Sequence, residues 1–167
     1  REFASRMAYV LLRAHGKVSD TDLQLLKVSP YRDVSLDSSY GRLIALLTKL
    51  GVVRGYPDGT FYPGQVTILA EAYQIIVETA ARISPDVATV LATQAKELRF
   101  SPDWFEKYAR TLAKFGIPTF KNYFQLSEET TPLFYITMLQ KLFEKAGIEN
   151  PLTGEPSLKV EQSVFNR

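Results

Sequence analysis

Few side chains in this sequence have the types and spacing that catalysis needs. The chain has one histidine, His15, and no cysteine, and it contains no Gly-x-Ser-x-Gly turn, glycine-rich phosphate loop or carboxylates at metal-ligand spacing. The adjacent acids Glu128 and Glu129 precede an expected helix, and they would interact favourably with the positive end of its dipole. His15 stands beside Gly16 at an expected helix end. The sequence therefore predicts a protein that is not an enzyme, with no catalytic residues, metal ligands or cofactors.

Turn-forming residues are concentrated in the stretch 51–63, which reads Gly-Val-Val-Arg-Gly-Tyr-Pro-Asp-Gly-Thr-Phe-Tyr-Pro. Gly51 can end a helix in the left-handed conformation, and Pro57-Asp58-Gly59 favours a tight turn. Tyr56 and Phe61 lie on either side of that turn. We expect both rings to fold back onto the neighbouring helices.

Helical periodicity flanks this stretch on both sides. Apolar residues recur at helical spacing in seven segments, and these are 1–14, 19–27, 43–50, 68–83, 85–95, 104–115 and 132–143. Ser19 with Asp22, Ser84 before Pro85 and Thr131 before Pro132 are expected to start helices. An irregular connector is expected at 120–127 and a short strand at 160–165.

The composition is that of a folded globular module. The chain has 46% hydrophobic and 23% charged residues, and its net charge of +2 comes from 20 basic and 18 acidic residues spread along the sequence. No basic block indicates nucleic acid, and no run approaches the roughly 18 apolar residues of a membrane span. Because the sequence starts with Arg1 inside an expected helix, we interpret it as part of a longer protein, with any export signal upstream.

The helical segments repeat at a spacing of roughly 65 residues. Gly51 corresponds to Gly116, Phe61 to Phe124, and Ala70-Glu71 to Leu133-Phe134. The helix entry Arg1-Glu2-Phe3-Ala4 corresponds to Ala70-Glu71-Ala72-Tyr73. The chain is therefore interpreted as the second half of one helix-loop-helix unit followed by two whole units.

The repeated residues resemble the motif of the surface-layer homology (SLH) family. In 51–63 and the following Ala70-Glu71-Ala72, the glycine, tyrosine, Asp-Gly, phenylalanine and proline fall at the motif's spacing. Asp33-Val34 resembles the motif's opening Asp-Val, and Trp104 falls where the family usually carries a tryptophan, a position held by Ser39 in the second unit.

The resemblance implies a mainly α fold of repeated helix-loop-helix SLH motifs in a pseudo-threefold spindle. The expected organisation is an SLH module over 1–146, with the second half of motif 1 at 1–15, motif 2 at 31–82, a degenerate motif 3 at 100–146, linking helices at 17–30 and 84–99, and a loop-rich tail at 147–167. Three helix-loop-helix units would pack around a shared apolar axis.

The resemblance also implies a non-catalytic, extracellular role in the bacterial cell envelope or S-layer. Such modules anchor proteins by binding a secondary cell-wall polysaccharide, often one carrying ketal-pyruvate, or peptidoglycan, in the grooves between motifs. A Thr-Arg-Ala-Glu element at each second-helix entry supplies an arginine, which pairs well with a carboxylate. Neither nucleic acid nor direct membrane insertion is expected.

This sequence departs from that element in each unit. The element becomes Ile68-Leu69-Ala70-Glu71 in the second unit and Thr131-Pro132-Leu133-Phe134 in the third. In the first unit only Arg1 and Glu2 remain, aligned with its last two positions. Two of the three expected arginines are therefore absent, and an apolar Leu69 cannot replace a bidentate cation.

The candidate glycan-binding residues follow from these motifs. They are Arg1, Glu2, Asp33, Arg54, Gly55, Tyr56, Asp58, Glu71 and Trp104. Arg54 and Tyr56 would offer a cation and an aromatic face to an anionic sugar, and Trp104 would offer a stacking platform. The alternatives are that Asp58 only shapes its turn and that Trp104 packs in the core.

Two functions remain open on this interpretation. The first is a cell-surface anchor that binds a cell-wall polysaccharide or peptidoglycan-linked glycan. The second is a protein-interaction scaffold that has lost glycan binding and contacts other envelope protein subunits, a function that Leu69 and Pro132 favour.

Overall fold

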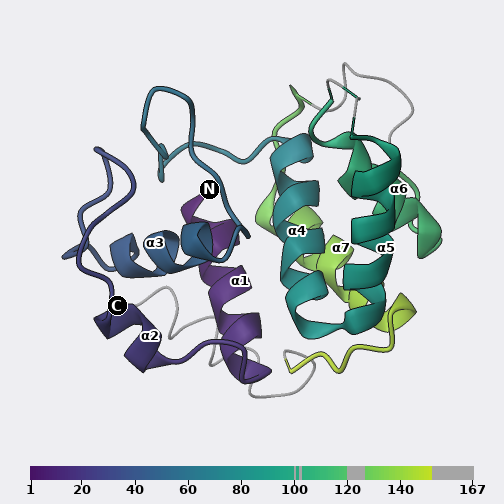
Figure 1. Ribbon diagram of the computed structural model, residues 1–167, viewed down its shortest axis with the longest axis horizontal. Helices are drawn as coiled ribbons and strands as arrows, with labels where there is room; N and C mark the ends of the chain where they lie inside the picture. Colours follow the sequence, from purple (N-terminus) through teal and green to yellow (C-terminus); the bar gives the residue numbers. More distant parts are fainter. Residues whose placement is uncertain (100, 102, 120–126, 152–167) are drawn as a thin grey trace.

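The protein is mainly helical, as the periodicity predicts. The computed structural model describes residues 1–99, 101, 103–119 and 127–151. Within these ranges it has seven helices and no strand: α1 (Glu2–Ala14), α2 (Asp20–Gln24), α3 (Gly41–Lys49), α4 (Leu69–Ile83), α5 (Pro85–Glu97), α6 (Glu106–Lys114) and α7 (Pro132–Lys145) (Figure 1). The strand expected at 160–165 and nearly all of the connector at 120–127 lie outside the described residues.

Three helices begin at the capping residues predicted from the sequence. Ser19 and Asp22 form a reciprocal capping box before α2. Ser84 caps α5 directly before Pro85, and the hydroxyl of Thr131 accepts a hydrogen bond from the backbone N–H of Phe134 (3.1 Å) at the start of α7. These local signals set where the helices begin.

Helix α2 is shorter than its sequence pattern predicts. It ends at Gln24 instead of continuing through Lys27. Leu25 and Val28 are 68% and 78% exposed, so neither side chain is held in the core. Instead, the guanidinium of Arg42 donates to the carbonyl oxygens of Leu23 and Leu26 (3.3 and 3.1 Å) and holds this segment against α3.

The first helices of the second and third units end in the same way. Gly51 after α3 and Gly116 after α6 both adopt positive φ, 75° and 72°. In each case a following apolar residue donates back into the helix: Val52 N–H to the carbonyl oxygen of Leu47 (2.9 Å) and Ile117 N–H to that of Leu112 (3.1 Å). The repeat seen in the sequence is therefore also a repeat of local structure.

The second helices of the three units form the centre of the molecule. Helices α1, α4 and α7 pack against one another. Helix α3 packs on α1, and α6 packs on α4 in the equivalent way (Figure 1). The large side chains of Tyr73, Tyr108, Tyr135, Phe61 and Phe143 are fully buried in this core, which provides most of the stabilisation.

The third unit carries an aromatic stripe, whose described members divide between core and surface. The stripe comprises Trp104, Tyr108, Phe115, Phe120, Tyr123 and Phe124. Tyr108 is 1% exposed and its hydroxyl donates to Glu78 of α4 (2.9 Å). Trp104 is 46% exposed and lies in the turn before α6, with its ring edge-on to Phe105 and Tyr108. Core packing of Trp104 is therefore wrong, because α6 begins only at Glu106. Three other members of that stripe, Phe120, Tyr123 and Phe124, lie outside the described residues.

Candidate functional site

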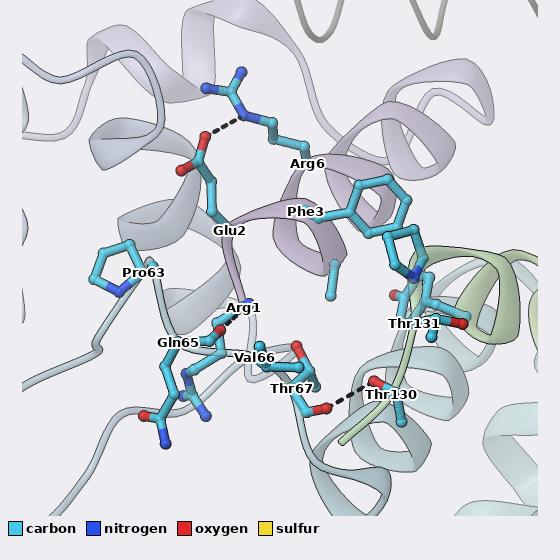
Figure 2. Close-up of a pocket in the computed structure, with 14 residues that line it drawn as sticks. Arg1, Glu2, Phe3, Arg6, Pro63, Gln65, Val66, Thr67, Thr130 and Thr131 are labelled. Atoms are coloured by element: carbon cyan, nitrogen blue, oxygen red, sulfur yellow. Dashed lines mark hydrogen bonds and ion pairs between the residues drawn. The ribbon is translucent and has the colours of Figure 1, made fainter.

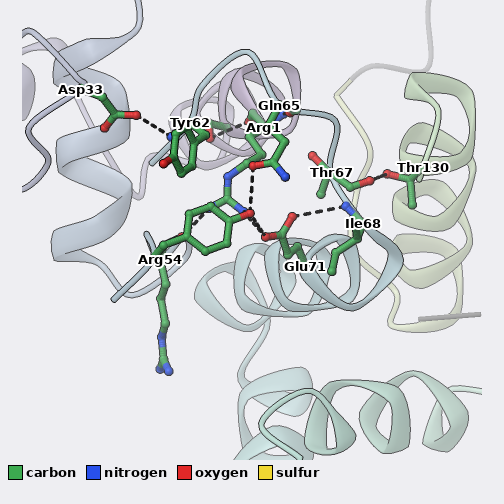
Figure 3. Close-up of polar contacts among 11 residues, drawn as sticks. Arg1, Asp33, Arg54, Tyr62, Gln65, Thr67, Ile68, Glu71 and Thr130 are labelled. Atoms are coloured by element: carbon green, nitrogen blue, oxygen red, sulfur yellow. Dashed lines mark hydrogen bonds and ion pairs between the residues drawn. The ribbon is translucent and has the colours of Figure 1, made fainter. Parts of the chain in front are cut away.

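Arg1 joins the first unit to the second. It immediately precedes α1, and its guanidinium reaches across to α4 (Figure 3). Nη1 pairs with Oε1 of Glu71 and donates to the Tyr56 hydroxyl (3.1 Å), while Nη2 donates to the carbonyl oxygen of Arg54 (2.6 Å). The side chains of Arg1 and Glu71 are only 5% and 12% exposed. This cluster is therefore a nearly buried, charge-balanced junction.

Aromatic rings enclose the Arg1 guanidinium. Its Cζ lies 4.7 Å from the ring centre of Tyr56 and 4.6 Å from that of Phe61, within the range of cation–π contacts. The Tyr56 hydroxyl donates to Oε1 of Glu71 (2.9 Å). Burial raises the pKa of Tyr56, and this hydrogen bond to Glu71 raises it further. Tyr56 thus stays a neutral donor to the carboxylate.

Two aspartates shape the loop that carries Tyr56. The carboxylate of Asp33 accepts hydrogen bonds from the backbone N–H groups of Phe61 (2.8 Å) and Tyr62 (2.7 Å). Asp58 accepts from the hydroxyl and the backbone N–H of Thr60 (2.5 and 3.0 Å), and the hydroxyl contact lowers the pKa of Asp58. Both carboxylates hold backbone in place.

Position 55 requires a glycine because neighbouring atoms approach its backbone closely, and not because of its own dihedral angles. A Cβ at this position would collide with the ring of Tyr31 and the carbonyl oxygen of Thr60. Tyr31 in turn packs against Phe61 at a ring distance of 5.2 Å. Gly55 therefore lets the loop close over the Tyr31 ring.

The remaining sequence candidates lie at other places. The side chain of Arg54 is exposed and points away from the Arg1 cluster (Figure 3), so only its carbonyl oxygen takes part. Glu2 pairs with Arg6 one turn along α1 (2.8 Å). Trp104 packs on α6 instead. The structure thus brings Arg1, Tyr56 and Glu71 together.

A groove opens where the starts of α1 and α7 meet the loop after Pro63. It has a volume of about 380 Å³. Its lining comprises Arg1, Glu2, Phe3, Ala4, Arg6, Pro63, Gly64, Gln65, Val66, Thr67, Thr130, Thr131, Pro132 and Tyr135 (Figure 2). Hereafter we call it the α1–α7 groove. It combines apolar side chains with amide and hydroxyl groups, the mixture found in sites for small organic ligands.

The far side of the α1–α7 groove is held by contacts between units. The Thr130 hydroxyl and backbone N–H both donate to the carbonyl oxygen of Thr67 (2.7 and 2.8 Å), and Leu69 N–H donates to that of Glu128 (3.0 Å). A second hollow of about 210 Å³ adjoins these hydrogen bonds. It is lined by Leu69, Glu128, Glu129, Thr130, Thr131 and Phe134.

The comparison with protein families identifies one segment of the chain. Residues 30–72 match the S-layer homology domain. The chain contains an SLH domain. No curated protein and no solved structure matches the chain.

The SLH domain includes α3, the 51–63 loop and the first turn of α4. It carries Asp33, Arg54, Tyr56, Asp58 and Glu71 and therefore supplies one half of the Arg1 junction. The SLH family is non-catalytic, implies a module that anchors proteins to the cell wall, and typically binds a cell-wall polysaccharide. It suggests a location at the cell surface.

Two negative observations apply to the part of the chain that the structure describes. None of its helices is long and apolar enough to cross a membrane. Its His, Asp and Glu side chains form no group of three or more that could hold a metal ion.

Helices α1 and α7 share a spacing of buried residues and a similar end. Met7 corresponds to Met138, Leu11 to Leu142, and Gly16 to Gly147, the two glycines having φ of 65° and 63°.

Sequence reasoning did not single out several residues of the α1–α7 groove. These are Arg6, Gln65, Thr67 and Thr130. Nor did it single out Tyr62, which directly precedes the groove residue Pro63. A residue before proline is expected to be extended, whereas Tyr62 has a φ of 51°. The repeat could have indicated Thr67 and Thr130, since each shortly precedes a second helix. Nothing in the sequence signals the conformation of Tyr62.

Proposed function

We propose that this chain anchors its protein to the bacterial cell surface by binding a cell-wall polysaccharide or peptidoglycan-linked glycan in the α1–α7 groove. The SLH domain supports an anchoring role. The observation that carries the assignment to this groove is its composition: a hollow of about 380 Å³ whose lining combines apolar side chains with hydroxyl, amide and charged groups.

The groove is suited to a sugar residue in size and chemistry. Small-molecule sites have volumes from about 300 Å³ upward and place a few polar groups in an apolar lining. Here Phe3 and Pro63 offer flat apolar surfaces, and Gln65 and Thr131 offer polar groups at the edge (Figure 2). Sugars present a C–H face and a hydroxyl edge, which match these two kinds of surface.

Blocking the groove is the direct test of this assignment. Val66 lines the groove and is 44% exposed, so Val66→Trp should fill the hollow without disturbing the core. Val28→Trp is the matched control, because Val28 is 78% exposed and lies outside the groove. We expect the wild type and Val28→Trp to sediment with purified cell-wall polysaccharide and Val66→Trp to remain in solution. Equal retention of both variants would remove the groove from the proposal.

The exposure of Leu133 favours a protein-interaction scaffold as the second candidate. Leu133 is 73% exposed in the first turn of α7, directly after Pro132. A large exposed apolar side chain at the meeting of two units is suited to contact another envelope protein subunit. A mass above the monomer that depends on concentration and is lost in Leu133→Ser would support this function over glycan binding.

A further inference from the structure

We propose that the α1–α7 groove is built for an uncharged sugar rather than an acidic one. This inference rests on the proposed glycan-binding function and adds the chemical class of the ligand. It follows from the way each charged side chain in the groove is paired with another charged side chain of the same protein.

The first cation of the groove, Arg1, already has a carboxylate partner. Nη1 of Arg1 pairs with Glu71, and with 5% and 12% exposure the two side chains are shielded from water. Both Nη atoms are used, by Glu71 and Tyr56 on one side and by the Arg54 carbonyl on the other. An acidic ligand would have to displace Glu71 and leave its carboxylate nearly buried without its cation, which is strongly unfavourable.

The second cation, Arg6, is balanced in the same way. Its Nε donates to Oε1 of Glu2 (2.8 Å), and its Nη2 donates to the hydroxyl of Ser39 (2.9 Å). Glu2 itself lines the groove beside Arg6 (Figure 2). The two arginines and two glutamates that line or adjoin the groove therefore cancel in charge.

The neighbouring hollow makes an acidic ligand still less favourable. Leu69 and Pro132, the first residues of α4 and α7, bring no charge. Glu128 and Glu129 are exposed at the edge of the adjoining hollow. A polyanion that extended from the groove along this edge would be repelled by both carboxylates.

The helix N-termini at the groove are also occupied by groups of the chain. Glu2 places a carboxylate in the first turn of α1, and its backbone N–H donates to the carbonyl oxygen of Pro63 (3.0 Å). In the first turn of α7, Pro132 has no N–H and that of Phe134 is taken by the Thr131 hydroxyl (3.1 Å). The positive ends of these helices are therefore weak attractants for an external anion.

The test compares native cell-wall polysaccharide with the same material after its carboxyl groups have been reduced to alcohols. We expect the wild-type chain to bind both with equal affinity, and the dissociation constant to change less than about twofold between about 50 and about 500 mM NaCl. Binding to the native but not to the reduced polymer would overturn this inference and leave the proposed function standing. Binding to neither would overturn both.

A pair of matched variants tests the charge balance itself. Glu2→Gln removes the carboxylate beside Arg6, and Glu106→Gln removes the equivalent partner of Arg110, one turn apart on α6 and away from the groove. We expect Glu2→Gln to bind an acidic polysaccharide such as polygalacturonate about fivefold more tightly than the wild type does, because the substitution frees one partly exposed cation from its partner. The affinity of Glu106→Gln for the same polysaccharide should equal that of the wild type. No gain in Glu2→Gln over the control would contradict the inference.

Discussion

Arg1 and Glu71 form an ion pair that connects the start of α1 to the first turn of α4, with both side chains almost fully buried. Arg1 lines the α1–α7 groove, yet its guanidinium faces the carboxylate of the neighbouring unit. The pair therefore acts as a link between units rather than as an open anion site. Its consequences for stability and for ligand choice can be measured separately.

Removing one member of this pair should destabilise the fold. We expect Glu71→Ala to lower the free energy of unfolding by about 3 kcal/mol, because Arg1 would remain nearly buried without its partner. Glu106→Ala, in a more exposed pair with Arg110, should change it by less than about 1 kcal/mol. Urea unfolding of both variants provides the comparison. Equal effects would show that the Arg1–Glu71 link does not hold the units together.

The backbone of Tyr62 should be strained, and relieving it should stabilise the protein. Its φ of 51° is unfavourable for an aromatic residue that precedes a proline. Since asparagine and glycine tolerate this region, Tyr62→Asn should raise the free energy of unfolding by about 1 kcal/mol. Thermal unfolding checks the sign. A loss of stability would mean that the Tyr62 ring, which packs 5.6 Å from Tyr56, contributes more than its backbone costs.

Asp33 should be essential for the conformation of the same loop. Its carboxylate accepts from the backbone N–H groups of Phe61 and Tyr62. We expect Asp33→Ala to cost about 2 kcal/mol, because two donors lose a charged acceptor. Asp37→Ala, on an exposed residue ahead of α3, serves as the control. Chemical unfolding monitored by circular dichroism would separate the two.

Stability should fall at high pH through Tyr9. Burial raises the pKa of Tyr9 to about 12, and the hydrogen bond that its hydroxyl donates to Asp20 (2.8 Å) also raises it. The unfolded chain loses this proton near the ordinary pKa of 10.0, so the contribution is complete below that pH and is lost as pH rises towards about 12. Melting temperatures across this range should fall less steeply for Tyr9→Phe. Parallel curves would contradict the assignment.

Much of the local structure could be predicted because it depends on neighbouring residues. Ser19, Ser84 and Thr131 begin helices as their side chains require, and Gly51 and Gly116 end them. The repeat indicated that the units share one apolar core, whereas the contacts among α1, α4 and α7 at its centre were found from the structure. Helix α2 was overestimated, because the exposure of Leu25 depends on tertiary packing.

The site could be predicted less well from the sequence, because it is formed by contacts between residues of different units. Arg1 meets Glu71 across the gap between α1 and α4, and Thr67 meets Thr130 between the second and third units. Neither pairing has a local signal. Arg54, chosen for its charge, contributes only its carbonyl oxygen to the cluster, because its side chain points away from Arg1.

The most direct measurement maps where the glycan binds. The chain has a mass of 18.9 kDa, so the backbone amides of an isotopically labelled sample can be followed by NMR while soluble cell-wall polysaccharide fragments are added. We expect shifts concentrated at Gln65, Thr67, Thr130 and Thr131, in the α1–α7 groove. Shifts centred on Trp104, or none at saturating glycan, would contradict it.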